Sequence, residues 1–108
     1  MAGAAVGLRA LGRADDVFEI VDGVRRAKAA ELLGKKSISA RLGGSMDVIE
    51  IPLANLRSPN KSVIDAAGAT NAKRFSSVLE GVRAGNTPPI SVNAGSRGPS
   101  IFDVILKF

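Results

Sequence analysis

The stretch FEIVDGVRRAKAAELLG, residues 18–34, limits the fold more than any other part of the chain. Residues 17–21 alternate in hydropathy, which predicts a strand, and the Asp-Gly pair directly after them predicts a turn. A helix is expected to follow as far as Leu33, because Gly34 stands where a left-handed C-terminal cap is wanted. This helix must pack its apolar side back against a sheet.

The remaining segments continue the alternation of strands and helices. Strands are predicted at residues 37–42 and 46–52, and a helix is predicted from Asn71 to Ala84 with Gly85 as its stop. In this helix the apolar residues recur at helical spacing, namely Phe75, Val78, Leu79 and Val82. PPISVN and IFDVILKF are predicted to be the last two strands, the second with a buried face of Phe102, Val104, Leu106 and Phe108.

The order of elements is β-α-β and then β-α-β-β. Such an order with two main helices predicts an α/β (α+β) domain with a small mixed sheet. At 108 residues the chain has room for one small core, which we place in residues 15–108. Residues 1–14 are expected to be a flexible leader or linker remnant, and the glycine-rich residues 43–45 are expected to be a hinge between units 15–42 and 46–108.

The charge balance favours a polyanionic partner. Lys and Arg number 15 against 10 Asp and Glu, which gives a net charge of +5. A merely soluble basic surface is the alternative. Because the chain has no Cys and no His, disulfides, the usual zinc sites, thiol nucleophiles and histidine bases are excluded. The apolar stretch near Met1 is too short to span a membrane.

Three basic residues, Arg25, Arg26 and Lys28, occupy the first turns of the first predicted helix. The macrodipole makes this end of a helix electropositive, so bases there indicate that an anion is expected. On a helical wheel Arg25 falls within the apolar face of Ala29, Leu32 and Leu33, and Arg26 at its edge. The pair therefore predicts a phosphate site, with an internal salt bridge to Asp22, Glu19 or Asp103 as the alternative.

Asp22 precedes this helix and has two interpretations. A carboxylate at this position caps the free amides of the first turn. It is also the acidic group nearest to the predicted anion, where it would bind a metal or position a water molecule.

At these residues the chain resembles the ParB/sulfiredoxin family. Residues 18–42 resemble its D-G-x-x-R-x-x-A-A segment and match the family's nucleotide-binding box at Gly23, Arg25, Arg26 and Ala29, with Lys28 keeping a charge. GNTPPISVN resembles the G-x-x-x-P-[IL]-x-V signature at Gly85, Pro89, Ile90 and Val92. VIEIPLANLRSPN is similar to the family's opening strand and turn.

The order of these pieces differs from that of ParB domains, in which the IPL strand comes first. The chain therefore resembles a circular permutation about residues 43–45, an arrangement also similar to C-terminal domains of Rhs-type polymorphic toxins. The catalytic Cys of sulfiredoxins would fall at Val24, so that activity is not expected. The helix-turn-helix of partition proteins is missing, so specific DNA sites are not expected either.

The resemblance implies phosphate-directed chemistry. Asp22 and Arg26 would be catalytic, and the phosphate or nucleotide would be bound by Gly23, Arg25, Arg26, Lys28, Gly85, Pro89 and Arg97. Arg57 is a further candidate. The implied cofactors are Mg²⁺ and CTP or ATP, without an assignable metal ligand set.

Three functions stay open. The first is a nuclease-type toxin effector that cleaves phosphodiesters in the cytoplasm of a target cell, delivered as the C-terminal part of a secreted toxin and held in check by a cognate immunity protein. The second is a nucleotide- or nucleic-acid-binding module without catalysis. The third is an inert engineered permutant.

Overall fold

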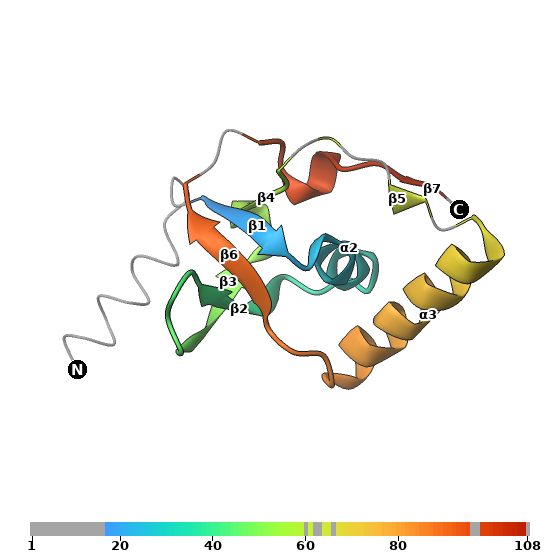
Figure 1. Cartoon of the computed structure of the whole chain (residues 1–108), viewed down its shortest axis with the longest axis horizontal. Coiled ribbons are helices and arrows are strands. Elements are labelled where there is room, and N and C mark those ends of the chain that lie inside the picture. Colours follow the sequence, from blue (N-terminus) through green and yellow to red (C-terminus); the bar gives the residue numbers. More distant parts are fainter. Residues whose placement is uncertain (1–16, 60, 62–63, 66, 96–97, 108) are drawn as a thin grey trace.

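The computed structural model describes residues 17–59, 61, 64–65, 67–95 and 98–107. Five strands form one mixed sheet in the order β3-β2-β6-β1-β4 (Figure 1). These strands are β1 (Phe18–Asp22), β2 (Ser37–Leu42), β3 (Val48–Pro52), β4 (Leu56–Arg57) and β6 (Ile90–Ala94). Pairs β1·β4 and β2·β6 are parallel, whereas β1·β6 and β2·β3 are antiparallel.

Two α-helices accompany the sheet in the described part of the chain. Helix α2 (Val24–Leu32) lies between the sheet and α3 (Ala69–Ala84), and α3 extends away from the sheet (Figure 1). Strands β5 (Ile64–Asp65) and β7 (Leu106–Lys107) pair in parallel beside α3. Short 3₁₀ turns, η1 (Leu53–Asn55) and η2 (Ile101–Asp103), precede β4 and β7. The chain is therefore a small mixed α+β domain with a curled sheet.

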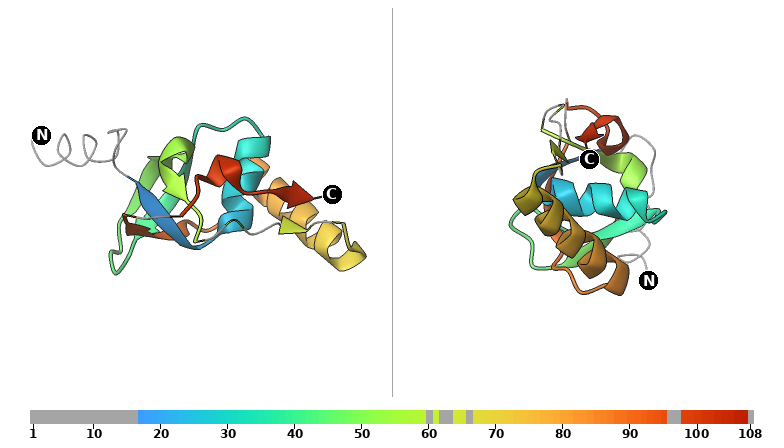
Figure 2. Two further views of the ribbon diagram at one scale, coloured as in Figure 1. Left: turned by 90° about the horizontal axis from the view of Figure 1, so that it is seen from above. Right: turned by 90° about the vertical axis from the view of Figure 1, so that its right-hand side faces the viewer.

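The core lies on one side of the sheet, where α2 and η2 cover it (Figure 2). Ile20, Ile90 and Val92 point inward from the central strands and are fully buried. They meet four consecutive buried residues of α2, from Ala27 to Ala30. Burial on all sides of a helix requires neighbours all around it, and alanine allows the sheet, α3 and η2 to approach closely.

The outward face of the sheet is mainly polar, although Val21 and Val48 are exposed on it. There the hydroxyl groups of Ser37 and Ser39 both donate to the Glu50 carboxylate, at 2.7 and 2.5 Å. Because one face is polar and the other apolar, the strands show the alternation that made them predictable from sequence.

Most of the predicted elements are confirmed. β2 has the predicted bounds, and the first strand and the long helix differ from prediction by one or two residues at their ends. Gly34 and Gly85 adopt φ of 76° and 73° after the two helices, as their cap positions require. Helix α3 buries Phe75 and Val82 and packs Val78 and Leu79 against the core. It begins after Gly68, without a side-chain cap from Thr70 or Asn71.

The predicted C-terminal strand is wrong over most of its length. Residues 101–103 form the turn η2, in which the Ser100 hydroxyl accepts the Phe102 amide at 3.2 Å. Burial therefore follows i, i+3 spacing: Ile101 and Val104 are buried, whereas Phe102 is 46% exposed. Phe108 lies outside the described residues.

The predicted hinge has a different role. Residues 43–45 lie in the turn between β2 and β3, which pair antiparallel from Ser37↔Pro52 to Arg41↔Val48. The Ser45 amide donates to the Leu42 carbonyl at 2.9 Å and closes this turn. The segment thus joins two neighbouring strands of one sheet. Residues 1–14, predicted as a leader, lie outside the described residues.

Neither described helix combines the length and the apolar character needed to cross a bilayer.

Candidate functional site: a groove between α2 and α3

Gly23 makes the sharp passage from β1 into α2. Its φ of 120° is disfavoured for residues with a side chain, and a Cβ there would lie 2.4 Å from Cγ2 of the buried Ile90. The Ala27 amide donates to the Gly23 carbonyl at 3.0 Å, which starts the helix. Gly23 is thus the N-cap, and no side chain caps it. The predicted capping role of Asp22 is wrong.

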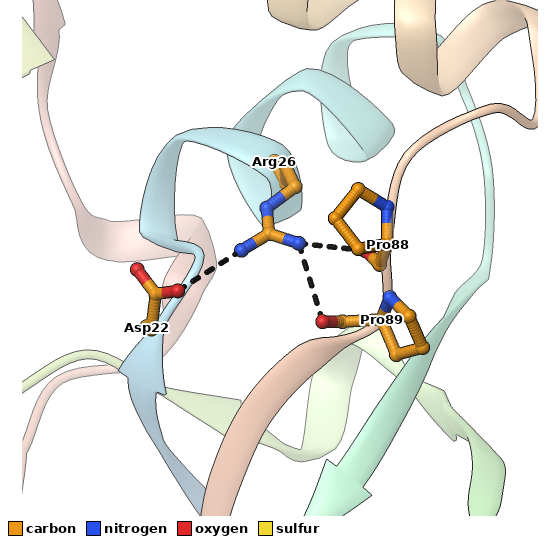
Figure 3. Close-up of polar contacts among 4 residues, drawn as sticks. All are labelled: Asp22, Arg26, Pro88 and Pro89. Carbon is orange, nitrogen blue, oxygen red and sulfur yellow. Dashed lines mark hydrogen bonds and ion pairs between the residues drawn. The ribbon is translucent and has the colours of Figure 1, made fainter.

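Arg26 is engaged by the protein itself (Figure 3). Its Nη1 donates to the carbonyl oxygens of Pro88 at 2.6 Å and Pro89 at 3.2 Å. Its Nη2 lies 3.2 Å from Oδ2 of Asp22. The Arg26 side chain is 16% exposed, whereas that of Asp22 is 78% exposed. Solvent screens the ion pair, so the carbonyl bonds do more to hold Arg26. This pair is the internal salt bridge that the sequence left open as an alternative.

Arg25 is placed differently. Its side chain is exposed, and within the described residues it has no hydrogen bond or ion pair. It is the second residue of α2, where the backbone amides of Val24, Arg25 and Arg26 find no acceptor inside the helix. Arg25 and these amides therefore present unused donors at the electropositive end of α2.

These residues line an open groove of about 770 Å³, which we call the α2–α3 groove. One side consists of residues 21–26, at the end of β1 and the start of α2. The opposite side is a face of α3 with Asn71, Arg74, Ser77 and Val78. Ser58 and Pro59 after β4, Ile64 and Asp65 of β5, and Thr87 complete the lining.

The groove has an excess of positive charge, because Arg25, Arg26 and Arg74 line it together with Asp22 and Asp65. Arg26 and Asp22 are joined to one another, and Oδ1 of Asp65 accepts the Ala67 amide at 2.9 Å. Arg25 and Arg74 are exposed and, among the described residues, have no acidic partner. Both guanidinium groups are therefore available to an external anion.

Lys28 lies apart from the groove. Its side chain is 7% exposed, and its ammonium group contacts Glu31 at 2.5 Å and the Ile101 carbonyl at 3.3 Å. The predicted apolar face of this helix is correct for Ala29 and Leu33 but wrong for Leu32, which is 50% exposed, because α2 buries residues 27–30. Through its bond to the Ile101 carbonyl, Lys28 connects α2 with η2.

The other predicted residues are distributed around the molecule. Gly85 caps α3 and lines a separate hollow of about 150 Å³. Pro89 contributes to the site through its carbonyl bond to Arg26. Arg57 donates to the carbonyls of Ala54 and Leu56 and does not line the groove. Arg97 lies outside the described residues.

The α3 side of the groove was not predicted from the sequence. Asn71, Arg74 and Val78 follow i, i+3, i+7 spacing, so their shared face was visible in the sequence. The local sequence does not show that this face is directed toward α2, because its direction depends on how α3 packs against the rest of the domain. Among the described residues no three His, Cys, Asp or Glu side chains gather as a metal site would need.

Comparison with known proteins gives no match: no family model, no curated protein and no solved structure corresponds to the chain.

Proposed function

We propose that the α2–α3 groove binds phosphate groups of a nucleotide or a nucleic acid, as the resemblance to ParB-like domains implies. The proposal depends on the placement of Arg25. Its guanidinium is exposed, lacks an acidic partner in the described chain, and lines a groove of about 770 Å³. A cavity of this volume falls within the range of roughly 300–1,000 Å³ typical of ligand sites.

The chemistry of the groove supports an anionic phosphate over a neutral or cationic ligand. Arginine offers a planar fork of donors that matches phosphate oxygens, and amides at a helix start add oriented donors. Arg26 acts as a positioning residue in this proposal, since its bonds to Pro88 and Asp22 fix the start of α2. The net charge of +5 favours polyanions at longer range.

Binding of labelled oligonucleotide and of CTP or ATP to the whole chain tests the proposal. Arg25→Ala is expected to weaken binding about tenfold or more, the cost of losing a charge-assisted contact. Lys73→Ala is the matched control, since Lys73 is exposed on α3 and does not line the groove. Equal binding by the Arg25 variant and the native chain would refute the proposal.

Phosphodiester cleavage is the second candidate, favoured by the exposed Asp22 carboxylate on the same groove. In this reaction Asp22 orients a water molecule whose oxygen attacks phosphorus while the bond to the leaving oxygen breaks. Asp22 takes the proton of the water, and the leaving oxygen receives one from solvent.

Incubation with plasmid and RNA, with and without magnesium, tests cleavage. If Asp22 acts as the base, the native chain is expected to form cleavage products and the Asp22→Asn variant is not. If the substrates stay intact under all conditions, cleavage is refuted and the groove is a binding site without catalysis. Expression inside bacterial cells addresses the toxin effector and its immunity partner. Unchanged viability contradicts that role.

A further inference from the structure

We infer that the groove takes a ligand with at least two neighbouring phosphate groups, held by Arg25 from α2 and Arg74 from α3. This inference rests on the proposed phosphate binding and extends it to the opposite side of the groove. Neighbouring phosphates occur in nucleoside polyphosphates and in nucleic acid strands, and both present the same chemistry.

The packing of α3 fixes the direction of Arg74. Phe75 and Val82 are buried at 2% and 5% exposure, which sets the rotation of the helix about its axis. Val78 follows Arg74 by four residues, packs against the core and also lines the groove. Residues at i and i+4 share a helix face, so Arg74 belongs to the groove.

Arg74 also lacks the local partner that Arg83 has on the same helix. Arg83 pairs with Glu80 at 2.5 Å through i, i+3 spacing. The positions at helical spacing from Arg74 that line the groove hold Asn71, Ser77 and Val78, none of which is acidic. A cation that lines a cavity without a partner in the described chain is available for an external anion.

Arg25 and Arg74 reach the groove from two different helices. Residues 21–26 around the start of α2 form one part of the groove lining, and a face of α3 forms another. A ligand with two neighbouring phosphates offers a separate anionic group to each arginine. Each additional contact raises affinity, because hydrogen bonds to charged groups contribute favourably to binding.

The remaining lining predicts weak discrimination among bases. No aromatic side chain lines the groove in the described residues, so the ring stacking that usually holds bases is not offered. Its apolar part is aliphatic, with Val24, Ile64 and Val78. Recognition therefore depends on phosphates, and ATP and CTP should bind alike.

Calorimetric titration at constant ionic strength tests this inference with phosphate, pyrophosphate, ATP, CTP and a ten-nucleotide oligo(dT). Pyrophosphate and the longer ligands are expected to bind at least tenfold more tightly than phosphate. Arg74→Ala should weaken them about tenfold or more and leave phosphate binding within twofold. Lys73→Ala, the control on the same helix, should change each affinity less than twofold.

The outcomes separate the two claims. Loss of binding in Arg25→Ala without any loss in Arg74→Ala overturns the two-sided ligand and retains the proposed function. Equal losses in Arg74→Ala and Lys73→Ala also overturn it, since net charge would then be the cause. Absence of binding by every probe overturns the proposed function itself. If pyrophosphate and ATP bind more tightly than oligo(dT), the ligand is a nucleotide. If oligo(dT) binds more tightly, the ligand is a nucleic acid strand. Thermal unfolding confirms that each variant is folded.

Discussion

Arg26 and Pro88 are 62 positions apart in the chain, yet Nη1 of Arg26 donates to the Pro88 carbonyl at 2.6 Å. This bond and the one to Pro89 connect the start of α2 to the segment that enters β6 (Figure 3). Both carbonyls belong to the segment just before β6, which begins at Ile90. The contact leaves Arg25, one position earlier, free of this structural role.

Arg26→Ala should therefore destabilise the fold, whereas Arg25→Ala should not. Loss of two carbonyl bonds and one screened ion pair is expected to lower the free energy of unfolding by about 1–2 kcal/mol. Arg25→Ala is expected to change it by less than about 0.5 kcal/mol. Urea denaturation of both variants measures the difference. Equal stability of the two variants would contradict the positioning role.

Gly23→Ala should be among the most damaging single substitutions. The new Cβ combines backbone strain at φ 120° with a 2.4 Å approach to Ile90, which is fully buried. Strain and overpacking together are expected to cost about 3 kcal/mol or more. Gly85→Ala is the control, since Gly85 has φ 73° but a Cβ at this residue would meet no atom within 4 Å. Its expected cost is about 1 kcal/mol, from strain alone.

The C-terminal segment offers a test of its 3₁₀ turn. Ile101→Ala should lower the free energy of unfolding by about 2–5 kcal/mol, because Ile101 is fully buried. Phe102→Ala should cost about 1 kcal/mol or less, since this larger side chain is 46% exposed. An alternating strand would give the reverse ranking. Denaturant unfolding of the two variants distinguishes these arrangements.

Lys28→Met should leave phosphate binding intact. Lys28 lies against Glu31 and Ile101 and does not line the groove, so its charge is not offered to a ligand there. Methionine keeps the packed stem while removing the ammonium group. The affinity for pyrophosphate is expected to stay within about twofold of the native value, in contrast to Arg25→Ala. A tenfold loss would mean that Lys28 belongs to the site after all.

Local patterns predicted the elements that depend on local chemistry. The alternation in β1 and the apolar stripe of α3 follow from the periods of strand and helix. Gly34 and Gly85 were found as caps because positive φ is costly for other residues. The C-terminal error has a physical cause as well. Every second residue from 102 to 108 is apolar, as in a strand, but the Ser100 hydroxyl accepts the Phe102 amide and a tight turn starts there instead.

The sequence alone determined that two arginines stand at the start of a helix after an Asp-Gly turn. Only the tertiary structure decided which of them is free: Arg26 meets carbonyls from residues 88 and 89, while Arg25 faces the groove. The tertiary structure also decided that Arg74 of α3 lines the same groove as Arg25 and Arg26. The reason is that a helix shows its own faces in its sequence, but the neighbours of each face depend on packing between distant segments.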